Sequence, residues 1–405
     1  MRSILLLFAL ALTVAACNNL EDADPAERNT FVKFFEGLYD LSASSIEVIP
    51  GGYIILGNEA VVLSDTTYVR TVLIETDENG NRVGDIHSFG GGTGKSFKPI
   101  VNSGTVTGYI VVGDSIYIDP QAEQAANVAI ASMRILVVNN TFDPSSVKNV
   151  YITDKTPLSP SHPVKIDFYG GAVNLSSNGS VIVLGTFKEG LINQQAAPEK
   201  QLLFALNNNQ DSTWFKTYDL LTNTYANARS VHYSNGKIIW ATAIADVQGD
   251  FTSSYIAIPK VSEESVFENF DPFGQNTTQL FLPQDIQPAR SAAFGYGVVG
   301  TYSQATDGSE SNLFFLRVDT QGNIIPGSDR YFDGIESFGL GVTDVPKDES
   351  SIVDTGETLT STSDGGFVLA GTMTTNPAKG NGGKDILLVK VTGQGDMIWA
   401  KTLGG

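Results

Sequence analysis

Short runs of apolar residues, separated by glycine-rich polar turns, recur along most of the chain. The clearest runs occupy residues 52–57, 108–113, 180–185, 237–242, 295–300 and 366–371, and all of them except 237–242 end in a glycine. A second apolar run follows each of them, at residues 71–75, 133–138, 201–206, 254–259, 312–318 and 385–391. Aromatic-rich segments come next, at residues 86–91, 147–153, 214–218, 266–273, 329–334 and 397–405. Short runs between turn residues predict β-strands rather than helices.

These runs define six repeating units, each completed by a less distinct strand in front. Tight polar turns with a late glycine join the last two strands, at residues 77–81, 319–323 and 392–396, where glycine supplies the positive φ that a hairpin needs. Continuous apolar runs need cover on both faces, which sheets arranged radially around an axis provide for one another. The sequence therefore predicts an all-β fold over residues 29–405, a six-bladed β-propeller with four-stranded antiparallel blades. Seven blades are the alternative.

Residues 31–37 resemble residues 399–405, although no complete unit surrounds them. Propellers often close by combining strands from both chain ends, so we expect residues 31–35 to lie against the C-terminal blade. Deleting residues 29–37 is then expected to lower the melting temperature by several degrees in a thermal unfolding experiment. An unchanged melting temperature would reject this closure.

The N-terminus has the pattern of a targeting signal. A short basic start is followed by an apolar stretch, residues 4–13, which is too short to span a bilayer as a helix. Val14-Ala15-Ala16-Cys17 resembles a bacterial lipobox, which implies a lipoprotein signal peptide over residues 1–16 and lipidation of Cys17. An ordinary signal peptide with an incidental cysteine is the alternative. Residues 17–28 are polar and acidic and are predicted to form a flexible tether.

Composition and charge narrow the possible partners. The net charge is −19, and removing residues 1–16 makes it one unit more negative, so binding to nucleic acid is not expected. Cys17 is the single cysteine, so the fold contains no internal disulfide. Apolar residues make up 41% of the chain, which is enough for a core.

The C-terminal unit, residues 364–405, reads DGG, four apolar residues and a glycine, then D-I-L-L-V-K, then W-A-K-T-L-G-G. It resembles the repeats of a propeller family common in secreted and surface proteins of Gram-negative bacteria. The second to fifth units match that pattern poorly. The resemblance implies the fold and a location in the cell envelope, anchored to the outer membrane on either face. It implies no catalytic residue, because the motif is structural.

Several motifs of the chain resemble chemical sites. Gly90–Ser96 resembles a phosphate-binding loop, but the first required glycine is missing and strand residues follow instead of a helix. Gly295–Gly300 fits a dinucleotide fingerprint, but it aligns with the apolar run of every other unit. The histidines, His87, His162 and His232, fall in three different units without metal-ligand spacing. We therefore expect no metal and no cofactor.

Binding residues are expected on the face that carries the long connections. The candidates are Tyr117 in the longest loop, Tyr302, and Arg229 and Arg290, which share an Ala-Arg-Ser fragment in the first strands of two units. A short extra strand with a buried ring is the alternative for Tyr117. For the two arginines, the alternative is pairing with acids of neighbouring blades.

The sequence thus predicts a lipid-anchored cell-envelope β-propeller that binds or scaffolds an outer-membrane protein or a glycan. One alternative is a polysaccharide lyase or hydrolase built on the propeller, although no motif gives a good reason to assign an enzyme. The other is a purely structural surface lipoprotein.

Overall fold

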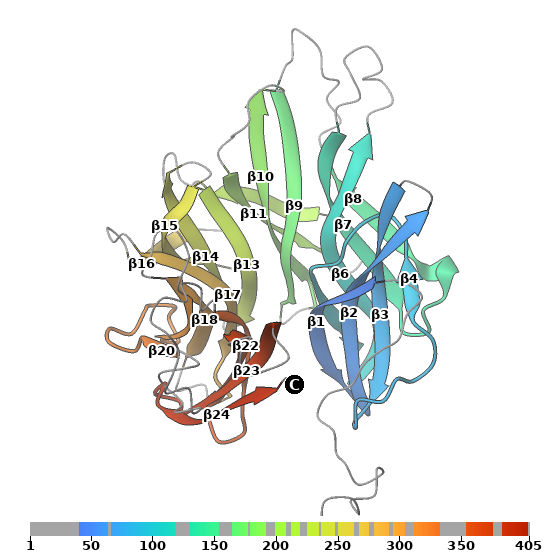
Figure 1. Ribbon diagram of the computed structural model, residues 1–405. Helices are drawn as coiled ribbons and strands as arrows, with labels where there is room; N and C mark the ends of the chain where they lie inside the picture. The colour runs from blue at the N-terminus through green and yellow to red at the C-terminus, as the bar shows by residue number, and fades with distance from the viewer. Residues whose placement is uncertain are drawn as a thin grey trace, which may run out of the picture.

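The structure is a computed structural model that describes residues 40–403, apart from gaps at 64–65, 119–128, 154–163, 177–178, 192–198, 208–211, 219–224, 235, 248–249, 263–266, 275–278, 291–294, 304–310, 333–353 and 376–382. Within these residues the chain forms β-strands and one short 3-10 helix, η3 (Pro144–Ser146) (Figure 1).

The strands group by four along the chain. The first strands are β1 (Asp40–Ile49), β5 (Ser96–Asn102), β9 (Val164–Leu175), β13 (Tyr225–Ser234), β17 (Leu280–Pro288) and β21 (Thr355–Ser361). The second strands are β2 (Gly52–Leu63), β6 (Thr105–Ile118), β10 (Val181–Leu191), β14 (Lys237–Val247), β18 (Tyr296–Ser303) and β22 (Phe367–Thr375). The third strands are β3 (Thr66–Asp77), β7 (Ala129–Asn139), β11 (Glu199–Leu206), β15 (Asp250–Ser262), β19 (Ser311–Val318) and β23 (Gly383–Val391). The fourth strands are β4 (His87–Phe89), β8 (Lys148–Ile152), β12 (Ser212–Tyr218), β16 (Phe267–Phe273), β20 (Arg330–Phe332) and β24 (Met397–Leu403).

Each group of four forms an antiparallel sheet in chain order, and we number the sheets first to sixth. A single parallel pair, Ser254 with Leu280, connects the fourth sheet to the fifth. Every apolar run and aromatic segment singled out in the sequence falls on a strand of the expected rank. The prediction of an all-β fold made of repeated four-stranded antiparallel sheets is therefore confirmed.

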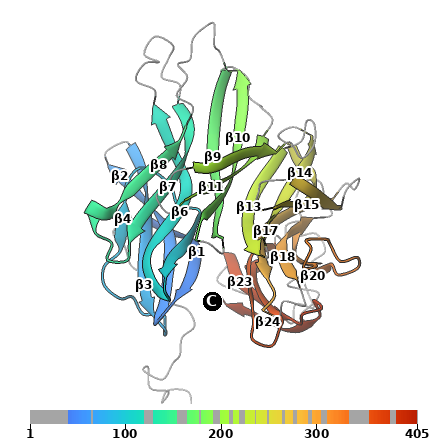
Figure 2. The same cartoon turned by 180° about the vertical axis from the view of Figure 1, so that it is seen from behind.

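The sheets follow one another around the molecule, as the colours of Figures 1 and 2 show. The first strand of each sheet from the second to the sixth contacts the first strand of the preceding sheet. The first strands therefore lie nearest a common axis. This arrangement is consistent with a β-propeller.

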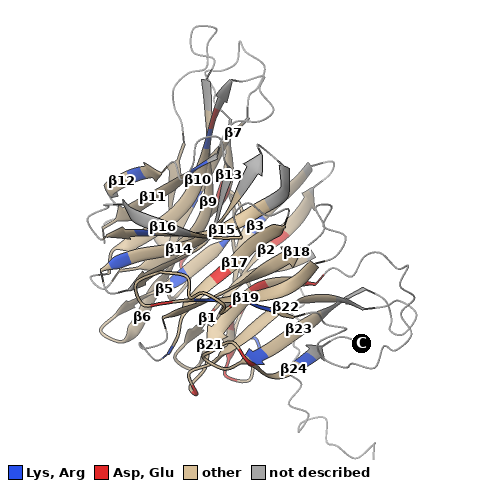
Figure 3. Cartoon of the chain, turned by 90° about the vertical axis from the view of Figure 1, so that its left-hand side faces the viewer, with Lys and Arg blue, Asp and Glu red and all other residues tan. Residues whose placement is uncertain are grey.

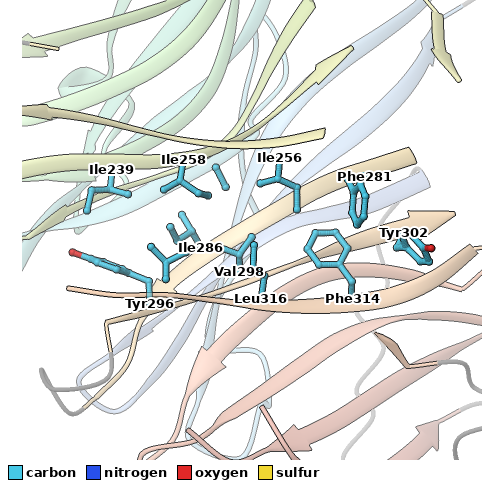
Figure 4. Packing of buried hydrophobic residues seen from close by; sticks show 12 residues of the cluster. Ile239, Ile256, Ile258, Phe281, Ile286, Tyr296, Val298, Tyr302, Phe314 and Leu316 are labelled. Carbon is cyan, nitrogen blue, oxygen red and sulfur yellow. The ribbon is translucent and has the colours of Figure 1, made fainter. Parts of the chain in front are cut away.

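The core consists of layers between successive sheets. Figure 4 shows the layer between the fourth and fifth sheets, where side chains of β14 and β15 face side chains of β17, β18 and β19. Similar clusters of buried apolar residues fill the junctions from the first sheet to the second, the second to the third, the third to the fourth and the fifth to the sixth. Both faces of the inner sheets are covered in this way, which explains their continuous apolar runs.

The tight turns between third and fourth strands have the geometry that the sequence predicts. Gly80, Gly322 and Gly395 have φ values of 76°, 82° and 91°, in the left-handed region that favours glycine. The first residue of each turn fixes its shape, because the Asp77 and Asp319 carboxylates accept backbone N–H groups two and four residues further on. The sequence repeat is therefore also a repeat of turn geometry.

Both glycine motifs lead into strands. β5 begins at Ser96, the last residue of the Gly90–Ser96 motif, and Gly295–Gly300 lies within β18 except for its first residue. Neither motif is followed by the helix that phosphate binding requires.

The predicted signal peptide, the tether and residues 29–37 lie outside the described residues, so the lipobox and the closure by residues 31–35 stay predictions. Within the described part of the chain, no helix is long and apolar enough to cross a membrane.

Candidate functional site

A β-bulge recurs in the first strands, which lie nearest the axis. In β1, β9, β13, β17 and β21 one residue is skipped in the register with the second strand. In the second sheet, the Thr93 N–H donates to the Asp114 carbonyl and the Lys95 N–H donates to the Val112 carbonyl. Two residues of this segment therefore stand opposite one of β6, and Lys95 is the skipped residue of this sheet. We call these skipped positions the bulge residues: Ser44, Lys95, Gly171, Arg229, Gln284 and Glu357. A bulge redirects the unpaired side chain, so these residues are the natural place to look for a site.

A glycine on the second strand faces the bulge in five sheets. These are Gly57, Gly113, Gly185, Gly300 and Gly371. A Cβ on Gly113 would lie 1.9 Å from the carbonyl oxygen of Thr93, and a Cβ on Gly371 would lie 1.8 Å from that of Thr355. The close approach of the bulged first strand therefore requires glycine, which explains why the apolar runs end in this residue.

The residue after this glycine binds the next sheet, in what we call the first inter-sheet bond. Its side chain accepts the backbone N–H of the residue just before the next bulge. The pairs are Gly94 N–H to Asn58 Oδ1 at 2.7 Å, Gly170 N–H to Asp114 Oδ1 at 2.8 Å, and Gly356 N–H to Thr301 Oγ1 at 3.2 Å. The same bond thus recurs at three junctions.

A second inter-sheet bond starts one residue after the bulge. The side chain at this position accepts a backbone N–H from the following sheet, two residues after that sheet's bulge. The pairs are Val173 N–H to Ser96 Oγ at 3.3 Å, Ile286 N–H to Ser230 Oγ at 3.3 Å, and Leu359 N–H to Asp285 Oδ2 at 3.2 Å. The polar groups nearest the axis are thus largely used to hold the sheets together.

Asp285 is the most heavily hydrogen-bonded member of this set. Besides the Leu359 N–H, it accepts bonds from Ser230 Oγ at 3.0 Å, Thr358 Oγ1 at 2.8 Å and Gln287 Nε2 at 3.2 Å. Burial raises the pKa of the Asp285 carboxyl, and the hydrogen bonds from Thr358, Leu359, Ser230 and Gln287 oppose this rise. Among the described residues no cation pairs with Asp285. It therefore joins three sheets through neutral donors.

Lys95 is a bulge residue with a charged partner. Its Nζ lies 2.6 Å from Asp114 Oδ2 and donates to the Gly170 carbonyl at 3.0 Å. Asp114 in turn accepts the Gly170 N–H, so the ion pair is built into the junction between the second and third sheets. Figure 3 shows basic and acidic positions scattered over the strands on the side in view, without a continuous patch of either sign.

Arg229 and Arg290, which share an Ala-Arg-Ser fragment, do not occupy equivalent positions in their sheets. Arg229 is a bulge residue of β13, although its side chain lies outside the described part of the structure. Arg290 lies beyond the end of β17, in the connection to β18, and is exposed. The residue of β17 that matches Arg229 is Gln284. The prediction that Arg290 lies in the first strand was therefore wrong. The same three residues can occur at different distances from the bulge, so the shared tripeptide does not show equivalent positions.

Tyr302 was expected on the face that carries the long connections, as a binding residue, but its ring belongs to the core. β18 continues to Ser303, and the Tyr302 ring packs 4.9 Å from that of Phe281 and 4.4 Å from that of Tyr331. Its hydroxyl accepts a hydrogen bond from Gln279 Nε2 at 2.8 Å. The strand extends past the glycine that marked its end in the sequence, so the ring is buried instead of presented to a partner.

Tyr117 lies in a strand rather than in a loop. β6 runs to Ile118, and Tyr117 stands opposite Ile130 of β7. The ring itself lies outside the described part of the structure, as does the whole of Cys17. The backbone placement agrees with the alternative of an extra strand, and the binding role of Tyr117 stays a prediction.

Exposed apolar side chains occur on the hairpins that join second to third strands in the first two sheets. Val62 and Tyr68 on the β2–β3 hairpin are 59% and 52% exposed, and Ile116 on the β6–β7 hairpin is 71% exposed. Since β1 and β5 contact each other and the two sheets have the same strand order, both hairpins lie at the same end of the fold. Tyr68 pairs with Val61, so Val62 and Tyr68 lie on opposite faces of their hairpin. We call Val62, Tyr68 and Ile116 the exposed hairpin residues.

The histidines that are described lie apart. His87 stacks on Phe142 with ring centroids 3.9 Å apart, and burial lowers its pKa. His232 contacts the Tyr296 ring, and burial, helped by the charge of Lys98, lowers its pKa to about 4. His162 lies outside the described residues. Among the residues that the structure covers, no three histidine, cysteine or acidic side chains are close enough to hold a metal ion.

No protein-family model matches the chain, and no curated protein sequence is similar to it. Among solved structures, it is similar to an α-L-arabinofuranosidase from Clostridium thermocellum, with a TM-score of 0.37, 15% identity, and coverage of 71% of this chain and 92% of that one. It is also similar to the acylaminoacyl peptidase of Pyrococcus horikoshii, with a TM-score of 0.44, 9% identity, and coverage of 90% and 46%. Prolyl oligopeptidase B from Galerina marginata gives a TM-score of 0.41, 8% identity, and coverage of 90% and 43%. This chain spans less than half the length of either peptidase, and similarities at this level assign neither substrate nor activity.

The bonding between sheets defines the class to which the chain belongs. It is an all-β protein of repeated four-stranded antiparallel sheets, arranged in a way that is consistent with a β-propeller. The inter-sheet acceptors Asn58, Asp114 and Thr301 went unnoticed in the sequence. Their signal was nonetheless present, because each directly follows the glycine that ends an apolar run.

Proposed function

We propose that this protein is a lipid-anchored, six-bladed β-propeller of the cell envelope that binds or scaffolds an outer-membrane protein or a glycan. The lipobox at Cys17 supports the anchor, and the series of alike sheets supports the ring. The observation that carries the binding role is the exposure of the hairpin residues Val62, Tyr68 and Ile116. Their apolar side chains lie at the end of the fold where the long connections emerge, and binding residues concentrate on such connections.

Closure of the ring between the sixth and first sheets is supported by one residue, Ile46. It lies two residues after the bulge of β1, where the other sheets have a buried apolar side chain: Phe97, Val173, Val231, Ile286 and Leu359. Each of these five packs in the cluster shared with the preceding sheet. Ile46 is 56% exposed, and its neighbour on the same face, Val48, is 74% exposed. The sheet that precedes the first one in a closed ring is the sixth, so the sixth sheet is the natural cover for Ile46.

The role of the exposed hairpin residues is tested by comparing two pairs of substitutions in the anchored protein. Crosslinking in intact cells, followed by affinity purification, is expected to recover a partner with the wild-type chain and to lose it with Tyr68→Ser combined with Ile116→Ser. The matched control changes Val83 and Val101, which are 47% and 53% exposed near tight turns at the other end of the sheets, to serine. Equal recovery of the partner with both variants would contradict the proposed surface.

The lipid anchor is tested separately from the partner. Cys17→Ser removes the thiol that lipidation requires, and several acyl chains together hold a protein on a bilayer durably. The variant is expected to move from the membrane pellet to the soluble fraction after cell lysis and centrifugation. Protease treatment of intact cells then shows which face of the outer membrane the wild-type protein occupies. Retention of the Cys17→Ser variant in the pellet at the wild-type level would contradict anchoring through Cys17.

A further inference from the structure

Arg134 of β7 is a buried cation at the junction between the first and second sheets. The residue is 1% exposed, and it stands opposite Gly113 on one side and Tyr151 on the other. Its Nε donates to Asn149 Oδ1 at 2.8 Å. Its Nη1 donates to Thr71 Oγ1 at 3.0 Å, so the side chain reaches from the second sheet into the first. Because the side chain is buried between two sheets, any N–H group of it without a hydrogen-bond partner lowers the stability of the junction.

The charge of Arg134 is not neutralised by a carboxylate. Nη1 also donates to the Gly92 carbonyl at 3.3 Å, so every partner of the guanidinium among the described residues is uncharged. Nη2 is buried and has no hydrogen-bond partner in the described part of the chain. Asp114, which contacts the same connector, already pairs with Lys95. A buried guanidinium with an unused donor group is costly, since both its charge and its N–H groups have lost water.

The connector above Arg134 consists mostly of glycine. Gly91 and Gly92 have φ values of 94° and 144°, and Gly91 is exposed. A Cβ on Gly91 would lie 4.0 Å from Arg134 Cζ and 3.0 Å from the Tyr151 hydroxyl oxygen, so the exposed Gly91 backbone and the Tyr151 hydroxyl both lie close to the guanidinium. The N–H groups of Gly91 and Gly92 make no hydrogen bond to backbone within the described residues. Successive free N–H groups in a glycine-rich turn are a recurring element of anion sites.

We propose that Arg134, the Gly91–Gly92 backbone and the Tyr151 hydroxyl form a binding site for a small oxyanion, either a phosphate or the carboxylate of an acidic sugar. The guanidinium supplies the charge, and the unused Nη2 supplies directed N–H donors. Tyr151 is 43% exposed, which places the entrance of the site at the surface. Burial lowers the pKa of Arg134, a shift that Tyr151 opposes, and a bound anion would favour the charged form. The site stands independently of the partner proposed above.

The experiment is thermal unfolding of the mature chain with increasing phosphate, glucuronate or glucose at constant ionic strength. Wild type is expected to show a saturable rise of several degrees with phosphate or glucuronate and none with glucose, because a ligand that binds only the folded state raises the melting temperature. A rise with phosphate alone assigns the phosphate source, and a rise with glucuronate alone assigns the acidic sugar. Arg134→Gln is expected to abolish the rise, whereas Arg82→Gln, at an exposed position, is expected to retain it. An equal rise in both variants would overturn the proposal.

A second measurement keeps the proposal testable if Arg134→Gln does not fold. Wild-type crystals soaked in bromide are expected to give an anomalous peak within hydrogen-bond distance of Arg134 Nη2. Peaks confined to exposed lysine and arginine side chains would show adventitious ions only and would overturn the site.

Discussion

Replacing Gly113 by alanine is expected to destabilise the fold strongly. We expect it to cost more than a glycine-to-alanine change elsewhere on β6. The added Cβ would lie 1.9 Å from the Thr93 carbonyl oxygen and 2.7 Å from its carbonyl carbon. Both are backbone atoms, so no side chain can turn away, and the bulged first strand has to move off the second. We expect a loss of about 3–5 kcal/mol in the free energy of unfolding, measured by urea denaturation, which is the range of severe core substitutions.

Gly90→Ala is the matched control for this prediction. It lies in the connector that leads to the same bulge, and a Cβ there would meet no heavy atom within 4 Å. Its expected effect is within about 0.5 kcal/mol of zero, as for a surface substitution without a special role. If the two alanine variants unfold at the same urea concentration, the bulge does not need the glycine and the explanation of the recurring Gly is wrong.

Replacing Asp285 by alanine is expected to have the second largest effect, a loss of about 2–4 kcal/mol. The carboxylate accepts hydrogen bonds from Ser230, Thr358 and the Leu359 N–H, which come from the sheets on either side. Without it the buried Leu359 N–H loses its acceptor, and an unsatisfied buried donor costs about 1–3 kcal/mol by itself. Urea denaturation measures this loss. The control is Thr358→Val, which removes one donor but leaves the carboxylate bonded, and which is expected to cost less.

The raised pKa of Asp285 predicts the direction in which the stability of the fold changes with pH. Its pKa is raised in the folded protein, so the folded state binds the proton more tightly than the unfolded state does. The contribution of Asp285 to stability therefore falls as the pH rises from the unfolded value of about 3.9 through the raised folded value. The free energy of unfolding of wild type, measured relative to that of Asp285→Asn, should therefore increase as the pH is lowered through this window. A difference between the two proteins that does not change with pH would contradict a raised pKa.

The strands were predictable because burial on both faces leaves continuous apolar runs that end at turn residues. The bulges were not, since a bulge depends on hydrogen bonds between two strands and leaves no fixed residue type: Lys95, Gly171 and Glu357 occupy equivalent positions. For the same reason Arg290 was matched wrongly to Arg229.

The candidate binding surface was only partly predictable. Tyr302 was expected on the binding face, yet the β18–β19 ladder continues past Gly300 and buries the ring. In the same way β6 extends beyond Gly113 through Tyr117, which turns the longest expected loop partly into a hairpin. Ile116 follows Gly113-Asp114-Ser115, which are typical turn residues, yet it lies exposed on the extended hairpin instead of in a loop.

Ring closure can be tested with a disulfide, because the chain contains a single cysteine. Thr372 follows Gly371, as Thr301 follows Gly300, and Ala43 precedes the bulge of β1, as Gly356 precedes that of β21. In a closed ring, Thr372 and Ala43 therefore repeat the first inter-sheet bond. We expect that contact to bring the two residues close enough for a disulfide, which needs Cα atoms roughly 4.4–6.8 Å apart.

The decisive measurement is oxidation of Ala43→Cys combined with Thr372→Cys in a chain that also carries Cys17→Ser. The control pair, Thr186→Cys with Ala228→Cys, occupies the equivalent positions at the junction of the third and fourth sheets. Both pairs are predicted to form an intramolecular disulfide in the monomer, seen as loss of free thiol by mass spectrometry without a dimer band on a non-reducing gel. A control pair that closes while the Ala43–Thr372 pair stays reduced, or links two chains, would contradict a ring of six sheets.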